Sequence, residues 1–272
     1  MARKLFCEIS PITYKISVER LILKRKIADA TNGLLFATIK DDKPLPVLVY
    51  SHNSLIRRRL GNVDMDLQNN KAVNLGIAAP HVNNILIRPG ETFSFWRLVG
   101  KTSRSKGYKD GLQISNGKTS AGIGGGMCQF TNLIHWMVLH SPLEITEHHH
   151  HDRYDLFPDF NRQVPFGTGT SIFYNYLDYR FYNPTNITFQ LITYTTDEYL
   201  CGELRADSEL SVSYHIKTRN EKFIREADGV YRCGEVYRDI IDKHTGISVN
   251  EELIRTNHAL VMYDIDESKI DN

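Results

Sequence analysis

The stretch Gly122-Ile123-Gly124-Gly125-Gly126-Met127-Cys128-Gln129 decides the fold that we expect for this chain. Four of its first five residues are glycines, which favours a tight loop, because glycine adopts backbone conformations that other residues avoid. Apolar residues then recur at the spacing of one helix face, at Phe130, Leu133, Ile134, Met137 and Val138. The sequence therefore predicts a glycine loop that leads into a buried helix, which carries Cys128 in its first turn and ends near Ser141-Pro142.

The segments on both sides of this stretch predict a mixed fold. Upstream, the patterns indicate a loosely helical basic segment over 9–31, strand over 34–50, a helix over 66–84 that Pro80 kinks or ends, strand-turn-strand over 85–95, and glycine-punctuated loops over 100–117. Downstream, alternating residues predict strands at 171–176, 178–183, 188–192, 210–217, 222–226 and 247–263. We expect an α+β fold with N-terminal helices, the buried central helix and an antiparallel sheet in the C-terminal half.

The length leaves the number of domains open. Residues 1–60 are expected to form an N-terminal extension of helix and strand, and residues 61–272 the main domain with its β-rich end. A single domain is the alternative. The basic residues of the helical segment are read as a solvated face, with contact to anionic lipid or polymer as the alternative.

The composition is typical of a globular protein, with 41% hydrophobic and 24% charged residues. Lys and Arg number 33 against 32 Asp and Glu, so the net charge of +1 does not favour a nucleic-acid partner. No run approaches the roughly 18 apolar residues of a membrane span. The basic start lacks an apolar signal segment, so a cytoplasmic location is expected. The four cysteines form no C-x-x-C pair, and reduced thiols are expected, with a Cys201–Cys233 bridge as the alternative.

Cys128 is the candidate nucleophile. A thiol attacks a carbonyl as its thiolate, and the first turn of a helix lowers a cysteine pKa through its unpaired N–H groups. The glycines would let the backbone approach a substrate, and N–H groups of Gly125, Gly126 and Met127 would hold an oxyanion. The alternative is that Cys128 is a small buried apolar residue, as free cysteines often are.

The run Glu147-His148-His149-His150-His151-Asp152 supplies a candidate general base. One imidazole and an orienting acceptor suffice for that role, and Asp152, Asp155 and Asp159 are near enough in sequence to orient it. A metal site is a weaker alternative, because zinc needs three or four ligands and no other residues have ligand spacing. Plain surface histidines are the remaining alternative. We expect neither a metal nor a cofactor.

Further residues are candidates for substrate contact. Asp178 and Arg180 share one face of a predicted strand, either as an exposed ion pair or as a cleft pair that grips a substrate carboxylate. Gln129 follows the cysteine, and Tyr108 is either a substrate contact or sheet packing. The glycine loop lacks the Lys-Ser/Thr of a phosphate loop, and the chain has no dinucleotide fingerprint, H-E-x-x-H or G-x-S-x-G motif.

The stretch 122–129 resembles the core motif of the VanW family, which is associated with glycopeptide resistance. The similarity continues in further segments of the chain, at 6–11, 88–95, 99–100, 106–108, 116–118, 147–151, 164–167 and 178–183. The resemblance implies that Cys128 is the motif cysteine, through which larger secreted relatives are associated with L,D-transpeptidation of peptidoglycan. His151 holds the family's histidine position and is the first choice for the base, with His149 second; His148 stands where the family usually has Arg.

Two functions follow as expectations. The first is cysteine-dependent acyl transfer on peptidoglycan stem peptides or their precursors, in cell-wall metabolism or glycopeptide resistance. The second is a non-catalytic protein that binds a cell-wall precursor or a partner in an envelope-stress or resistance system. A papain-like amidase is a third and weaker alternative, since that class also begins a helix with its cysteine.

Overall fold

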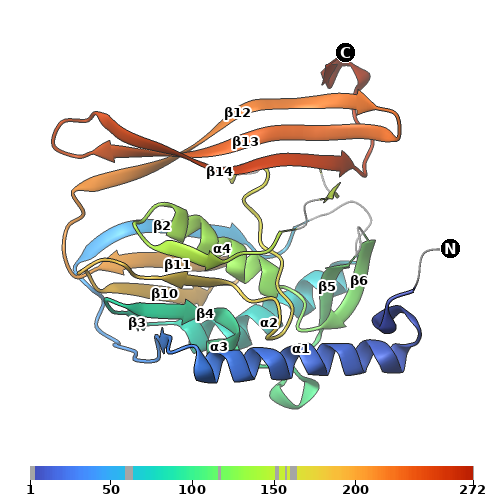
Figure 1. Ribbon diagram of the computed structural model, residues 1–272, viewed down its shortest axis with the longest axis horizontal. Helices are drawn as coiled ribbons and strands as arrows, with labels where there is room; N and C mark the ends of the chain where they lie inside the picture. The colour runs from blue at the N-terminus through green and yellow to red at the C-terminus, as the bar shows by residue number, and fades with distance from the viewer. Residues whose placement is uncertain are drawn as a thin grey trace.

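The computed structural model describes residues 4–58, 64–115, 118–150, 153–156, 158–159 and 164–271. In these residues four α-helices and four sheets form a main body and one outlying sheet (Figure 1). The helices are α1 (Pro11–Thr31), α2 (Met65–Val82), α3 (Phe95–Val99) and α4 (Met127–Leu139), with short 3-10 helices η1 (Phe6–Glu8), η2 (Arg104–Lys106) and η3 (Glu267–Lys269). None of these described helices is both long and apolar enough to span a membrane.

The main body is built on an antiparallel sheet that α2 and α4 cover on one face. Its strands lie in the order β2 (Val47–Leu55), β11 (Tyr199–Ala206), β10 (Phe189–Thr195) and β3 (Ile85–Ile87). Thr193 donates to the Ala79 carbonyl of α2 at 3.1 Å, while its cross-strand partner Gly202 lies under Met137 of α4. A Cβ at Gly202 would come within 2.7 Å of the Met137 side chain, so this glycine lets α4 pack closely.

A second small sheet joins α1 to the body. It consists of β1 (Leu35–Phe36), β4 (Glu91–Ser94), β9 (Arg180–Tyr182) and β7 (Glu144–Glu147) in that order. Phe93 and Phe181 stack at its centre with ring centroids 4.7 Å apart, and both are fully buried. Beside this sheet the hairpin of β5 (Asp110–Ser115) and β6 (Lys118–Ile123) leads into the glycine loop before α4.

The C-terminal sheet lies across from β2 and α4 as a separate layer (Figure 1). Its strand order is β15 (Ile270–Asp271), β12 (Val212–Glu226), β13 (Gly229–Asp242), β14 (Ser248–Val261) and β8 (Tyr154–Asp155). In the described residues β8 pairs with β14 only at Leu260 and Val261. Within the part of the chain that the structure describes, the remainder of β14 has no second strand partner, and this edge faces the main body (Figure 1).

The α+β class is confirmed, as is the buried helix that carries Cys128 in its first turn. The helix predicted over 66–84 is also confirmed, and it ends two residues after Pro80. It continues past the proline because a proline in the last turn removes only one backbone hydrogen bond. The strand predicted at 171–176 is wrong: Phe173 and Leu177 form a turn instead. The hairpin of β5 and β6 was not predicted, because its glycines suggested loops. The domain boundary at residue 60 stays a prediction, although β2 from that segment pairs with β11.

Candidate functional site

The glycine loop before α4 is shaped by the chain itself. A Cβ at Gly125 would overlap the backbone of Gly111 in β5, and the Gly125 carbonyl accepts from the Asn74 amide at 2.9 Å. Gly126 is the N-cap of α4 with φ of +112°, and a Cβ there would lie 2.6 Å from the stem of Lys71. At these two positions the glycines are required by close approach of the chain to itself, whereas the sequence suggested approach to a substrate.

Lys71 of α2 is an unusual neighbour of this loop. It is only 6% exposed, and no described acidic side chain forms an ion pair with it. Burial, together with the positive charges of Arg58 and Arg57, lowers the pKa of its ammonium to about 7. A lysine whose ammonium is buried without an acidic partner contributes to stability through the packing of its aliphatic stem and not through its charge.

Cys128 lies where the sequence predicted, in the first turn of α4, and retains partial exposure. Burial raises the pKa of its thiol, although the backbone N–H groups of Ile172 and of Cys128 itself favour the thiolate. Of the three predicted oxyanion donors, the Gly125 N–H already donates to the Gly122 carbonyl, at 3.2 Å. Gly126 and Met127 stand at the start of α4, where backbone N–H groups have no partner within the helix.

The segment 168–172 separates Cys128 from the histidines that follow β7. Thr170 binds α4, because its N–H and hydroxyl donate to the Asn132 side-chain oxygen at 2.6 and 2.8 Å. On the other side of this segment, His148 Nε2 donates to the Gly169 carbonyl at 2.8 Å. Among the described residues no imidazole nitrogen lies within hydrogen-bonding distance of the Cys128 sulfur.

His149, the second choice for the base, points to a different partner. Its Nε2 lies 3.0 Å from Glu147 Oε1. Glu147 also accepts two bonds of 2.6 Å from Arg25 of α1 and one from the Asp178 N–H. Burial alone would raise the pKa of Glu147, but these donors together lower it. His151, the first choice, and Asp152 lie outside the described residues, so both base assignments stay predictions.

Asp178 and Arg180 lie on one face, as the strand period predicted, with 2.8 Å between Oδ2 and Nε. The prediction of an exposed ion pair is wrong, because Asp178 and Arg180 are 0% and 4% exposed. Arg180 forms a bidentate pair with Asp29 of α1 at 2.7 Å, and Asp178 accepts from the Ser94 hydroxyl and the Trp96 N–H. Their polar atoms bind the protein itself, and a contact with substrate stays a prediction.

The remaining predicted contacts are also occupied or enclosed. Gln129 donates to Ser54 Oγ and the Leu55 carbonyl, both at 2.9 Å, and so ties α4 to β2. Tyr108 is 2% exposed, and its hydroxyl has no hydrogen-bond partner among the described residues. Its role in substrate binding is untested, as is that of Gln129. The four cysteines are free thiols in the structure, so it contains no Cys201–Cys233 bridge.

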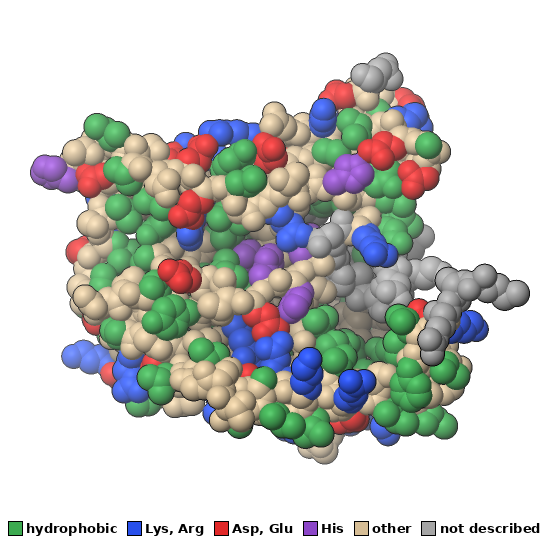
Figure 2. Space-filling view, viewed as in Figure 1, with side chains coloured by type: hydrophobic (Ala, Val, Ile, Leu, Met, Phe, Trp, Pro, Cys, Tyr) green, Lys and Arg blue, Asp and Glu red, His purple; other side chains and the backbone are tan. Residues whose placement is uncertain are grey.

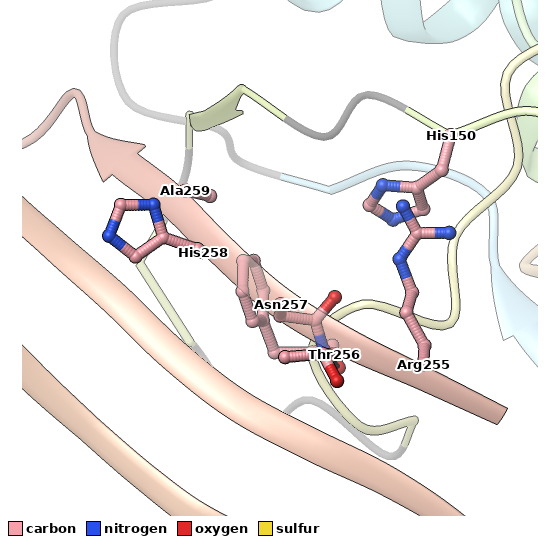
Figure 3. A pocket seen from close by; sticks show the side chains of 7 residues that line it. His150, Arg255, Thr256, Asn257, His258 and Ala259 are labelled. Atoms are coloured by element: carbon pink, nitrogen blue, oxygen red, sulfur yellow. Dashed lines mark hydrogen bonds between the residues drawn. The ribbon is translucent and has the colours of Figure 1, made fainter. Parts of the chain in front are cut away.

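A groove that the sequence did not predict lies between α4 and the edge of β14. It holds two neighbouring cavities, of about 430 and 270 Å³. The larger is lined by His135, Leu139, Leu143, Glu144, Ile145, His148, Arg238, Leu253 and Ile254. The smaller is lined by His150, Phe166, Arg255, Thr256, Asn257, His258 and Ala259. Figure 2 shows histidine side chains gathered in the hollow between the two layers, and in Figure 3 His150 and Arg255 reach into the smaller cavity from opposite walls.

One ring nitrogen of His135, in this groove, lacks a hydrogen-bond partner among the described residues. His135 is 1% exposed, its ring stacks on His148 at 4.4 Å, and its Nδ1 lies 3.1 Å from the Tyr179 hydroxyl. Its Nε2 is buried without a hydrogen-bond partner among the described residues. If Nδ1 accepts from the tyrosine, only the Nε2–H lacks an acceptor; the other tautomer would leave both Nε2 and the tyrosine hydrogen unsatisfied. The favoured tautomer therefore leaves a buried N–H donor on a residue that lines the larger cavity.

Both basic and acidic side chains surround this donor. Burial lowers the pKa of His135 well below its usual value, and positive charge on His148, His150 and Arg255 lowers it further. Arg238 is held by Glu252 at 2.6 Å and by the Ser141 carbonyl, and Glu144 is the acidic residue of the lining. The groove thus combines a buried N–H donor with the guanidinium groups of Arg238 and Arg255, which suits an anionic acceptor such as a carboxylate.

One signal in the sequence could have indicated this groove. His135 is a histidine on the buried face of an otherwise apolar helix, and such a position demands a partner. The β14 contributions could not be found, because Arg255 and Asn257 join His135 only through the long-range placement of the C-terminal sheet. Among the described residues no group of three His, Cys, Asp or Glu side chains is arranged to hold a metal ion.

The thiol of Cys128 allows a first test. Because burial raises its pKa, we expect its alkylation by iodoacetamide to rise steeply with pH and to reach half its maximum above the value of about 8.5 for a free cysteine. The rate is measured by intact mass, with Cys128→Ser reporting the other cysteines. A plateau already reached below pH 7 would contradict this prediction and show an activated thiolate.

Comparison with known proteins agrees with the resemblance seen in the sequence. The family described as "VanW like protein" matches residues 70–205. The vancomycin B-type resistance protein VanW of Enterococcus faecalis is 35% identical over 237 residues, which cover 87% of this chain and 86% of that protein. The uncharacterized protein YoaR of Bacillus subtilis is 34% identical over 113 residues, 42% of this chain but only 35% of YoaR. No solved structure matches the chain.

Proposed function

The chain belongs to the VanW family, and from this premise we propose that it binds a peptidoglycan stem peptide or precursor through a free carboxylate, as a non-catalytic component of glycopeptide resistance. The name of the Enterococcus faecalis relative supplies the resistance context. Peptidoglycan stem peptides end in a carboxylate and are short enough for a groove of this size. The expected cytoplasmic location is part of the proposal, and fractionation of cells checks it.

A single observation carries this proposal: the buried Nε2–H of His135 that has no acceptor among the described residues. A buried donor left unsatisfied costs about 1–3 kcal/mol, and a bound carboxylate oxygen would remove this cost. Arg238 and Arg255 line the same groove and favour the negative charge of the ligand. The open edge of β14 alongside supports an extended peptide, because an unpaired strand offers backbone donors and acceptors.

Acyl transfer by Cys128 is the second candidate. It is supported by the helix-start position, the partial exposure of the residue and the N–H of Ile172 beside the sulfur. In this reaction His151 or His149 takes the proton of the Cys128 thiol, and the thiolate attacks the peptide carbonyl carbon. The histidine then returns the proton to the leaving amine, and a thioester remains on the cysteine. An amine acceptor or water would then release the acyl group. The raised thiol pKa of Cys128 favours binding over this reaction.

Calorimetry with a synthetic stem peptide that ends in D-Ala tests the proposal. We expect binding to the wild type, a loss of at least about tenfold in affinity for the C-terminally amidated peptide, and a similar loss in Arg255→Gln and His135→Asn. Exposed His215 provides the matched control, and His215→Asn should bind like the wild type. Cys128→Ala should also keep the wild-type affinity.

Two results would overturn the proposal. The first is equal affinity for the free acid and the amide, which would remove the carboxylate from recognition. The second is an acyl adduct, seen by intact mass after incubation with peptide or a carbapenem and lost in Cys128→Ser. That adduct would establish the cysteine as a nucleophile in place of a binding function.

A further inference from the structure

Helix α1 carries its apolar side chains on the outside. Ile12, Ile16, Leu23 and Ile27 are 72%, 52%, 59% and 56% exposed, although their spacing places them on one helix face. In the whole of this 21-residue helix only Ile22 is buried. Ordinary surface helices bury their apolar face, so α1 has the reverse arrangement.

The orientation of α1 is fixed by charged side chains on the opposite face. Arg25 forms its bidentate pair with Glu147 of β7, and Asp29 forms one with Arg180 of β9. Strands β7 and β9 both belong to the sheet beside α1, and α1 lies along the outer side of the body (Figure 1). These pairs hold the apolar stripe toward the outside, where it cannot rotate into the core.

The apolar surface extends beyond α1. The preceding residues Leu5, Phe6 and Ile9 are 63%, 55% and 62% exposed, and η1 packs against α1. A contiguous exposed apolar surface marks a binding face, whereas single exposed apolar residues are common on any protein surface. Figure 2 shows apolar and basic side chains together along the edge where α1 lies.

The charge beside the stripe identifies the class of partner. Lys15, Arg20, Lys24 and Lys26 are all exposed. One exposed acid, Glu19, lies on the same helix face as the stripe, and it pairs with Lys101 at 3.9 Å. A helix that combines an apolar stripe with flanking basic residues is suited to the interface of an anionic bilayer, where the side chains of lysines extend to the headgroups. A second copy of the same basic face would be repelled by like charge.

We propose that α1 and η1 dock the protein on an anionic membrane surface, with the stripe Ile12, Ile16, Leu23 and Ile27 inserted among the headgroups. The helix lies in the plane of the interface and does not cross the bilayer. This inference is independent of the proposed function, since it rests on α1 alone and not on the groove. It adds a site of action at the membrane surface.

Vesicle co-sedimentation of the full chain tests this inference. We expect the wild type to sediment with vesicles of phosphatidylglycerol and phosphatidylcholine in equal amounts, and at least about tenfold less with pure phosphatidylcholine. The double variant Ile16→Ser/Leu23→Ser should lose at least about tenfold of its partitioning. The variant Lys24→Glu/Lys26→Glu should lose the preference for the anionic vesicles.

The control uses equally exposed apolar residues elsewhere. Ile247 and Val249 of the C-terminal sheet are 63% and 60% exposed, and Ile247→Ser/Val249→Ser should sediment like the wild type. Wild-type protein that stays in the supernatant would overturn the inference, as would an α1 variant that binds normally. A dimer in analytical ultracentrifugation that disappears in Ile16→Ser/Leu23→Ser would also overturn it, because the stripe would then join two copies.

Discussion

Replacing Arg180 with methionine should lower the free energy of unfolding by about 3–5 kcal/mol, the usual cost of removing one partner from a buried ion pair. The guanidinium binds Asp178, two residues before β9, and Asp29 on α1, and Arg180 is 4% exposed. Without it, Asp178 stays fully buried with only the Ser94 hydroxyl and backbone N–H groups as donors. The loss is measured by urea denaturation followed by tryptophan fluorescence.

The matched control for this prediction is Arg225→Met. Arg225 pairs with Glu267 at 2.5 Å, but the two side chains are 53% and 81% exposed, so the change should cost less than about 1 kcal/mol. In Arg180→Met/Asp29→Asn the second change should cost less than it does alone, because the two residues share one contact. A loss in Arg180→Met no larger than in Arg225→Met would show that the pair is not required for stability.

The part of the site that lies in one continuous stretch could be predicted from the sequence. The glycines at 122–126 and the apolar spacing that follows are local signals, and they place Cys128 in the first turn of α4. The reason for Gly125 could not be predicted, because Gly111 is brought against it by the pairing of β5 with β6. The sequence indicates where a glycine stands but not what approaches it.

The relations between distant segments could not be predicted. The resemblance to the VanW family makes His149 the second choice for the base, yet its Nε2 contacts Glu147, whose carboxylate is held by Arg25 from the first helix. The solvated basic face predicted for α1 is confirmed at Lys24 and Lys26, which are exposed, but Arg25 and Asp29 face the sheet and form ion pairs with it. Periodicity reports which residues share a face, and only the ion pairs with the sheet decide which face lies inward.

Lys71→Met should raise the free energy of unfolding at pH 7 by about 2–4 kcal/mol, because it removes a buried ammonium that lacks an acidic partner among the described residues. Methionine keeps the length of the aliphatic stem, which lies against Gly126. The matched control is Lys101→Met, since Lys101 is 62% exposed and its change should alter stability by less than about 0.5 kcal/mol.

The pH dependence distinguishes this charge effect from a gain in packing. The Lys71 pKa is 10.5 in the unfolded chain and about 7 in the fold, so between these values the unfolded chain binds more protons. The stability of the wild type therefore rises with pH across this window, and the advantage of Lys71→Met falls from its full size near pH 7 toward zero near pH 10.5. Urea denaturation of both proteins across the window measures the difference. An advantage that does not change with pH would assign the effect to packing, and a less stable variant at pH 7 would show that the ammonium has an anionic partner.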